Sequence, residues 1–198
     1  MTIEAIMVDV DGVLLVHPDP GGWSANLERD LGVSATKLQS AFFAPHWDDV
    51  IHGRATLRER LEPVLGEIAP HVPYGALTDY WFSNDAHVDR ALLAELSSLR
   101  AEGMQIHLAT VQEHERASYI WNELGFRNAF DGLHYAAELG CVKPSADFYR
   151  AIEKRTGFAP DALFFIDDKI ENVDAAIACG WSAALWTGTA TLTSLLPR

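Results

Sequence analysis

The chain has 198 residues, of which 48% are hydrophobic and 22% are charged. This composition is that of a soluble globular protein and excludes disordered, collagen-like and membrane-embedded classes. Acidic residues outnumber basic ones by 28 to 15, and the net charge of -13 disfavours nucleic acid and anionic lipid as partners. No apolar run reaches the ~20 residues of a membrane span and no charged leader opens the chain, so we expect a cytoplasmic location.

The first predicted element is a buried strand over Ile6–Val10. A short β-branched run there ends at the acidic turn Asp11-Gly12, a pattern typical of a strand that stops at a sheet edge. The length of the chain allows one well-buried core with an accessory module.

Residues 16–85 differ in character, with Trp23, Trp47 and Trp81 among several Pro and Gly residues. Helical patterns cover 23–31 and 57–65. Two capping boxes, Thr36-x-x-Gln39 and Thr56-x-x-Glu59, indicate helix starts, because their side chains satisfy free amides of a first turn. We predict a helical cap over residues 16–85, inserted into a core of residues 1–15 and 86–198.

From residue 89 onward, strand patterns alternate with helix patterns. This alternation predicts an α/β fold with a doubly wound, parallel, Rossmann-like sheet and right-handed crossovers. The expected strands are 105–109, 133–136, 162–166 and 183–186, and the expected helices are 89–101, 115–124, 147–155, 170–178 and 192–196.

Polar residues follow the predicted strands at the edge where ligands bind in open parallel sheets. Because the carboxyl ends of the strands share that edge, we expect these residues to meet. They are Asp9-Val10-Asp11-Gly12 after strand one, Thr110 after strand two, Lys143-Pro144 after strand three and Asp167-Asp168 after strand four.

Four carboxylates at one edge require a compensating cation, since like charges a few ångström apart raise one another's pKa. Magnesium suits carboxylates, a backbone carbonyl, waters and a phosphate oxygen. Lys143 adds a second positive charge and Thr110 a hydroxyl donor, which fit the oxygens of a phosphoryl group. The residues therefore predict a site for Mg²⁺ and a small phosphate ester.

In this order the four motifs resemble those of the haloacid dehalogenase-like superfamily, and the resemblance spans nearly the whole chain. The insertion after the first motif looks like the small helical cap of that superfamily. The run Lys143-Pro144-x-x-x-x-Tyr149 is similar to its sugar-phosphate phosphatases. The resemblance implies a magnesium-dependent phosphatase acting on a small phosphate monoester, with a sugar phosphate as one candidate.

The resemblance also implies roles for individual residues. Asp9 would be the nucleophile that forms an aspartyl phosphate, and Asp11 the general acid and base. Dehalogenase members lack the second aspartate, so Asp11 favours phosphoryl transfer. Asp9, the Asp11 carbonyl and Asp168 would hold Mg²⁺, with Asp167 binding directly or through water. Thr110, Lys143 and Gly12 would bind the phosphate.

Two features of the site depart from the family pattern or lie outside it. Val111 follows Thr110 where many members have Asn, so either Gln112 takes over that contact or the contact is absent. In the cap, Trp47, His46 and Arg54 are the candidates for substrate specificity.

Alternative interpretations stay open for function and for single residues. A phosphomutase of the same superfamily would return the phosphoryl group to a sugar, and a receiver-like switch would be phosphorylated without turnover. A phosphonate-cleaving member would need a cap lysine, for which only Lys37 is present. Asp167 could instead cap the following helix. Asn172 and Asp174 are expected on an exposed helix face.

Overall fold

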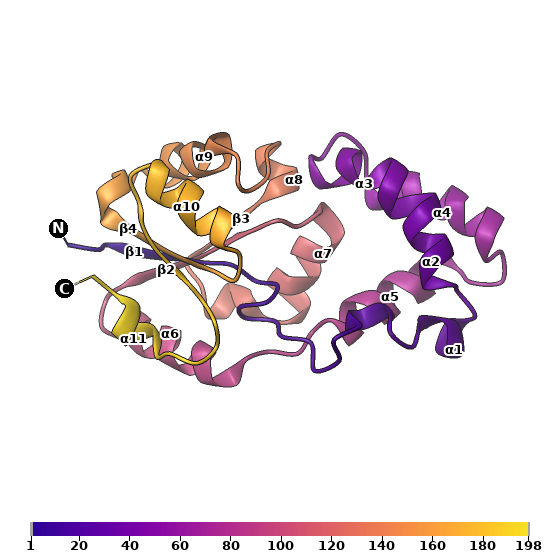
Figure 1. The fold of residues 1–198 in the computed structure, drawn as a ribbon, viewed down its shortest axis with the longest axis horizontal. Helices are drawn as coiled ribbons and strands as arrows, with labels where there is room; N and C mark the ends of the chain where they lie inside the picture. Colours follow the sequence, from indigo (N-terminus) through magenta and orange to yellow (C-terminus); the bar gives the residue numbers. More distant parts are fainter. Residues whose placement is uncertain (1, 198) are drawn as a thin grey trace.

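The computed structural model describes residues 2–197 and contains a twisted, five-stranded parallel sheet (Figure 1). The strand order is β3-β2-β1-β4-β5, with every neighbouring pair parallel. The order reverses at β1, and the carboxyl ends at such a switch point are where ligands bind. The strands are β1 (Ala5–Val8), β2 (Gln105–Thr110), β3 (Gly132–Tyr135), β4 (Leu163–Asp167) and β5 (Ser182–Leu185).

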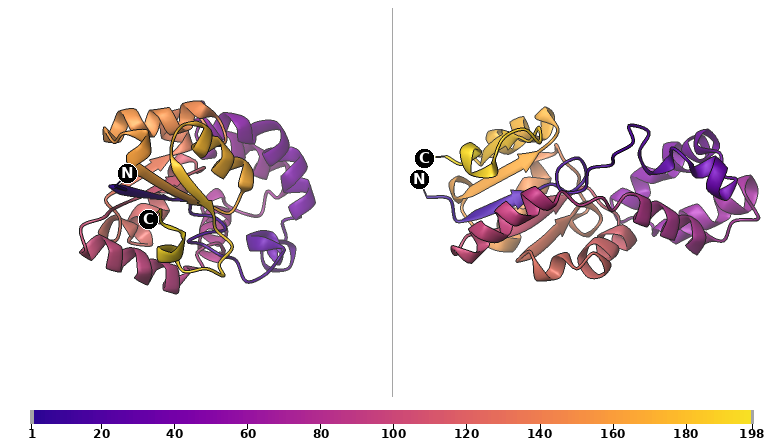
Figure 2. Two further views of the ribbon diagram at one scale, coloured as in Figure 1. Left: turned by 60° about the vertical axis from the view of Figure 1, so that its left-hand side comes forward. Right: turned by 90° about the horizontal axis from the view of Figure 1, so that it is seen from below.

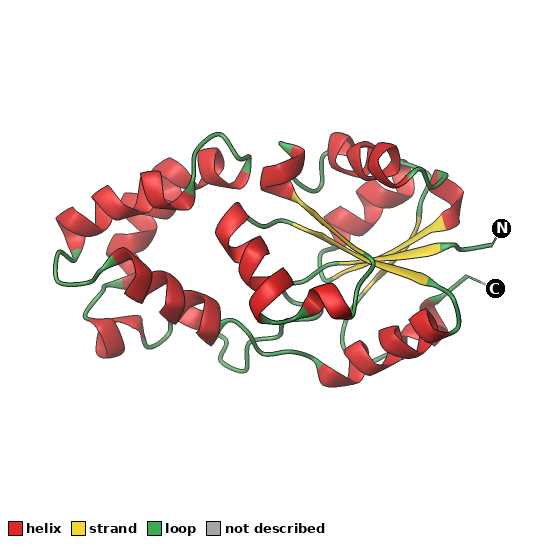
Figure 3. Cartoon of the chain, turned by 180° about the vertical axis from the view of Figure 1, so that it is seen from behind, coloured by secondary structure: helices red, strands yellow, loops and turns green. Residues whose placement is uncertain are grey.

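Helices cover both faces of the sheet, as Figure 3 shows from behind. Alternate side chains of β1 explain why both faces are apolar: Ile6 and Val8 pack on the side of α6 and α11, whereas Ala5 and Met7 pack on the side of α9 and α10. The core helices are α6 (Arg90–Ala101), α7 (His114–Ser118), α8 (Ala136–Leu139), α9 (Ala146–Thr156), α10 (Ile170–Ala178) and α11 (Leu192–Leu195), with the π-helical segment η3 (Tyr119–Glu123) and the 3-10 segments η4 (Phe126–Asn128) and η5 (Pro160–Ala162).

A separate group of helices lies between β1 and α6, and we call residues 22–84 the helical unit. Figure 2 shows it beside the sheet, joined to it by two linkers and lying away from both chain termini. It has its own hydrophobic cluster, which includes Phe42, Leu61 and Trp81. Its elements are η1 (Gly22–Ser24), α1 (Leu27–Leu31), α2 (Ala35–Leu38), η2 (Gln39–Phe43), α3 (Ala44–Ile51), α4 (Leu57–Ile68) and α5 (Tyr74–Asn84).

The capping box at Thr56 is present, because its hydroxyl accepts from Glu59 N while the Glu59 carboxylate accepts from Thr56 N. The box predicted at Thr36 is wrong. Ser34 caps α2 instead and accepts from Lys37 N, so the helix begins before Thr36. The helix expected over 23–31 is split into η1 and α1.

The predicted α/β fold with a parallel Rossmann-like sheet is confirmed by the strand pairing and by the helices on both faces. Strand boundaries shift by one or two residues from those expected, and α10 begins and ends where the sequence places it. None of the helices within residues 2–197 combines the length and the apolar character needed to cross a membrane.

Candidate active site

The residues that follow the strands meet at the carboxyl edge of the sheet. Asp9 comes directly after β1, Thr110 ends β2, Asp167 ends β4 and Asp168 follows it. The Lys143 side chain reaches the same place from the segment after α8. The convergence expected from the sequence is therefore present, because parallel strands direct all of these residues to one edge.

Lys143 is the central cation of this edge and is almost wholly buried, with its side chain 1% exposed. Its Nζ lies 2.9 Å from Asp9 Oδ1 and 2.5 Å from Asp167 Oδ2, and it donates to the Ala109 carbonyl at 3.1 Å. A solvated loop charge would make none of these contacts. Lys143 thus joins the two buried carboxylates at the ends of the neighbouring strands β1 and β4.

The two carboxylates paired with Lys143 behave differently. Burial is the main cause that raises the pKa of Asp9 to about 7; Lys143 acts against this rise and the charge of Asp167 adds to it. Burial also pushes the pKa of Asp167 upward, but Lys143 and the hydrogen bonds from Asn172 and Lys169 outweigh it, so this pKa lies below its usual value. Asp167 is the better-compensated charge of the pair.

Asn172 is buried beneath Asp167, contrary to the expected exposed position on α10. Its Nδ2 donates to Asp167 Oδ1 at 2.9 Å and to Oδ2 at 3.0 Å. The Tyr149 hydroxyl donates to the Asn172 carbonyl at 2.7 Å, which gives the tyrosine of the Lys143-Pro144 run a structural role. The helix pattern does not distinguish Asn172 from Asp174 as the inward position, and only Asp174 is exposed as predicted.

Three carboxylates can hold a cation here. Asp9, Asp167 and Asp168 each offer an oxygen, and these oxygens lie within 4.8 Å of one another. Gly12, with a φ of +81°, adjoins Asp168 so closely that a Cβ at this position would collide with its carboxylate. The donor set is hard and oxygen-based, which suits Mg²⁺.

The Asp11 side chain lies outside this cluster and is 51% exposed. Gln112 Nε2 donates to Asp11 Oδ2 at 2.7 Å and lies 3.5 Å from Thr110 Oγ1. Gln112 is buried, so the amide two residues after Thr110 reaches Asp11. Val111, the residue in the usual position of the asparagine, lies among the apolar side chains of the sheet.

Sequence reasoning missed three charged groups that are linked to Asp11 through Arg116. Arg116 Nη2 lies 2.7 Å from Asp11 Oδ1, and Arg116 Nη1 lies 2.8 Å from Asp85 Oδ2. Glu113 caps α7 by accepting from Glu115 N and Arg116 N, and burial raises its pKa to about 7. The contacts of Arg116 with Asp11 and Asp85 join distant parts of the chain, so only the tertiary structure reveals them.

The three specificity candidates of the helical unit lie in different surroundings. Trp47 is half-buried and packs against Phe43 and Trp81, with ring centroids 5.4 and 5.8 Å apart. His46 packs near Phe42 within the same unit. The guanidinium of Arg54 is paired with Asp48 and Asp49, so the structure does not bring it to the carboxylate cluster.

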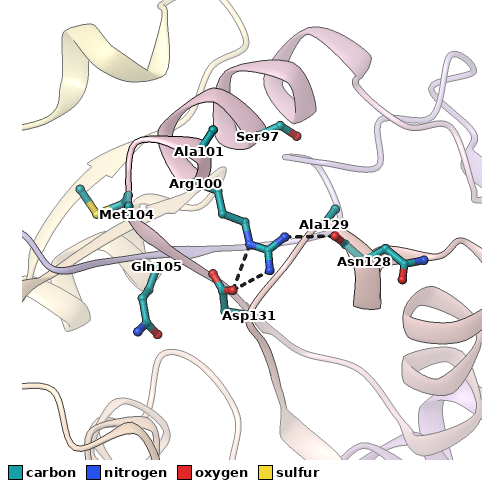
Figure 4. Close-up of a pocket in the computed structure, with 9 residues that line it drawn as sticks. Ser97, Arg100, Ala101, Met104, Gln105, Asn128, Ala129 and Asp131 are labelled. Atoms are coloured by element: carbon teal, nitrogen blue, oxygen red, sulfur yellow. Dashed lines mark hydrogen bonds and ion pairs between the residues drawn. The ribbon is translucent and has the colours of Figure 1, made fainter.

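A groove of about 720 Å³ lies at the opposite edge of the sheet, where β2 begins (Figure 4). Its Arg100 is committed to Asp131 at 2.7 Å and to the Asn128 carbonyl at 3.1 Å. The groove does not include any of the predicted site residues. The carboxyl edge, with its acidic cluster and buried lysine, is therefore the candidate active site.

Comparison with known protein families decides the classification of this chain. The model of the haloacid dehalogenase-like hydrolases matches residues 3–180, which is most of the chain. The chain belongs to this hydrolase family. Membership sets aside a receiver-like switch, and so does the strand order, because receiver domains have the order 2-1-3-4-5.

Individual relatives are similar over nearly the whole length. A sesquiterpene phosphatase, astK, from Aspergillus oryzae is 24% identical over 185 residues, covering 90% of this chain and 87% of the relative. A HAD family enzyme from Bacteroides thetaiotaomicron, BT-2542, solved as a magnesium complex, has a TM-score of 0.82 at 19% identity with full coverage of both chains. A haloacid dehalogenase from Xanthobacter autotrophicus has a TM-score of 0.65 at 18% identity, covering 96% of this chain and 79% of the dehalogenase.

Proposed function

We propose that this hydrolase is a magnesium-dependent phosphatase that cleaves a small phosphate monoester through an aspartyl phosphate on Asp9. The observation that carries the proposal is the arrangement around Asp9, whose carboxylate pairs with the buried Lys143 and has oxygens of Asp167 and Asp168 within 4.8 Å. This combination supports phosphoryl transfer, because the charge and the N–H donors of a lysine suit the oxygens of a phosphoryl group.

In the first step, an oxygen of Asp9 attacks phosphorus and the bond from phosphorus to the leaving oxygen breaks. The electron pair of that bond stays on the leaving oxygen, which takes a proton from Asp11. In the second step, Asp11 accepts a proton from water as the water oxygen attacks the acyl phosphate. Inorganic phosphate leaves and the Asp9 carboxylate is restored. The exposed face of the Asp11 carboxylate suits both proton transfers.

Bound Mg²⁺ supplies positive charge that offsets Asp9, Asp168 and the phosphoryl oxygens. Asp9 and Asp168 have free oxygen lone pairs for it. Asp167 is the most occupied of the three carboxylates, because its two oxygens already face donors from Lys143, Lys169 and Asn172 in four contacts, and an ionised carboxylate has about four lone-pair sites. We therefore place Asp167 as a ligand through water and as the partner that keeps Lys143 in place.

The test is steady release of inorganic phosphate from a panel of phosphate monoesters, with Mg²⁺ or with a chelator. We expect turnover only with the metal, and little with Ca²⁺, whose looser shell does not enforce in-line geometry. Asp9→Asn should fold and bind metal less tightly, with turnover abolished because an amide is too weak a nucleophile. Activity of that variant above a few per cent of wild type, or full activity in chelator, would disprove the mechanism.

A phosphomutase remains the alternative within the family. It would use the same Asp9 and Asp11 but return the phosphoryl group to the other hydroxyl of a sugar. The two activities differ in product, because a mutase forms an isomeric sugar phosphate with little free phosphate. Measuring both products from the same reaction separates them. A dehalogenase is disfavoured by Asp11, since halide departs without a proton.

The helical unit favours an ester with an apolar leaving group over a sugar phosphate. Trp23 stacks on Trp81 with ring centroids 4.9 Å apart, and Trp81 also packs against Phe43 and Trp47. These four rings form an aromatic cluster with little hydrogen-bonding capacity. The similarity to a sesquiterpene phosphatase supports the same class of leaving group.

Comparing kcat/KM for farnesyl phosphate, glucose 6-phosphate and nitrophenyl phosphate tests the leaving-group class. We expect the prenyl ester to be preferred, and Trp47→Ala to lower kcat/KM for it more than for nitrophenyl phosphate, because only the former depends on contacts beyond the phosphate. Equal losses with a large drop in melting temperature would leave Trp47 as packing. Preference for the sugar phosphate would reject the apolar class.

A further inference from the structure

Arg116 is a buried cation that joins two carboxylates from distant parts of the chain. Its side chain is 4% exposed. One terminal nitrogen contacts Asp11 in the loop after β1 at 2.7 Å, and the other contacts Asp85, the residue directly after α5, at 2.8 Å. The guanidinium therefore bridges the proposed acid-base residue and the end of the helical unit.

Arg116 and Gln112 together fix the orientation of the Asp11 carboxylate, in addition to balancing its charge. Arg116 holds Oδ1, while Gln112 donates to Oδ2, also at 2.7 Å. Both donors come from the segment that follows β2. A carboxylate with one donor on each oxygen has lost its rotation about the last side-chain bond, which is the freedom an acid-base group must lose to work efficiently.

The donor segment is itself fixed from both sides. Glu113 accepts from the backbone amides of Glu115 and Arg116, which anchors the residue whose side chain reaches Asp11. On the other side, Asp85 N donates to the Trp81 carbonyl, so the backbone of Asp85 is fixed at the end of α5. A planar guanidinium suits such a two-sided bridge, because its donors diverge at fixed angles.

We infer that Arg116 is a positioning residue for the proton transfers of Asp11, and that Asp85 acts through Arg116 to tie that carboxylate to the helical unit. The inference rests on the proposed function, in which Asp11 protonates the leaving group. A guanidinium that only balanced charge would stabilise the fold without regard to the leaving group. A positioning residue affects the esters whose departure needs a proton.

The experiment compares an alkyl phosphate with nitrophenyl phosphate in Arg116→Gln and Arg116→Lys. Complete loss of acid-base catalysis slows a reaction by ~10² to 10⁴. Misplacement of Asp11 is a partial loss, and we expect it to slow turnover of the alkyl ester by at least ~10-fold. We expect a smaller loss for nitrophenyl phosphate, whose leaving group departs without protonation. Arg116→Lys should recover part of the alkyl activity, because it keeps the charge but only one of the two contacts.

Combination with Asp11→Asn separates positioning from folding. If Arg116 acts through Asp11, then Asp11→Asn with Arg116→Gln should be no slower on the alkyl ester than Asp11→Asn alone. By the same reasoning, Asp85→Asn should lower alkyl turnover in the wild type and have no further effect beside Arg116→Gln. Arg100→Gln is the control, because Arg100 makes a 2.7 Å pair with Asp131 at the far edge of the sheet and should leave both activities unchanged.

Several results would overturn the inference. Equal losses for both esters in Arg116→Lys and Asp85→Asn, or additive losses beside Asp11→Asn, would make Arg116 a structural charge while leaving the phosphatase itself intact. If Arg116→Gln does not fold, the lysine and asparagine variants decide by the same comparison. A wild-type protein that releases no phosphate, or an Asp9→Asn variant with full turnover, rejects the proposed function and this inference with it.

Discussion

Removal of the buried lysine should destabilise the protein, and the structure sets the size of the effect. Lys143→Met takes away the cation between Asp9 and Asp167 and leaves two carboxylates in an almost dry environment. Removing one partner of a buried pair costs about 3 to 5 kcal/mol. Because the pKa of Asp9 is already about 7, Asp9 can take up a proton and limit the loss, so we expect the lower end of that range.

A loss of ~3 kcal/mol corresponds to a fall in melting temperature of about 6 to 12 °C for a chain of this size. The assay is thermal unfolding at about pH 8 in chelator and in Mg²⁺. The metal should restore part of the stability, since it supplies a second cation to the same carboxylates. Adding Asp167→Asn to Lys143→Met should also recover stability, because it removes one of the unpaired charges.

Lys154→Met is the matched control, because Lys154 is exposed on α9 and its loss should change the stability by less than about 0.5 kcal/mol. A Lys143→Met protein that melts with the wild type in chelator would refute the reasoning. So would an Asp167→Asn addition that lowers the melting temperature further, since the two carboxylates would then not repel one another.

Asn172→Ala should lower the free energy of unfolding by about 1 to 3 kcal/mol, because Asp167 loses its buried amide donor. It should also raise the Mg²⁺ concentration needed for half-maximal activity. Asp174→Ala on the exposed face is the control, and equal effects of the two variants would contradict the role of Asn172. In metal-free protein, the raised pKa of Asp9 contributes stability that is full below its unfolded pKa of 3.8 and is lost as the pH rises through about 7. Mg²⁺ binds the ionised carboxylate, so its gain in melting temperature should be larger at about pH 8 than at about pH 5. A gain independent of pH would count against Asp9 as a ligand.

The sequence by itself determined the fold class and which polar residues lie at the carboxyl edge of the sheet, because both depend on short local patterns. An apolar run that stops at Asp11-Gly12 predicts a strand end wherever it occurs in the chain, and parallel strands bring their carboxyl ends together without further information. Asp9, Thr110, Lys143 and Asp167 could therefore be placed at one edge before any contact was known. The capping box at Thr56 succeeded for the same reason, since its donors and acceptors lie within one turn.

Only the tertiary structure decided which groups control these residues. The pattern of α10 does not show which polar residue faces the core. Packing of α10 against the sheet places Asn172 beneath Asp167. The contact from Arg116 to Asp11 joins residues more than a hundred positions apart, and the contact to Asp85 depends on how the helical unit meets the core. From its sequence alone Trp47 could face a ligand or its neighbours, and in the structure it packs against Phe43 of η2 and Trp81 of α5. Such contacts carry no signal in the local sequence, because long-range packing selects one among many orientations that the local pattern permits equally.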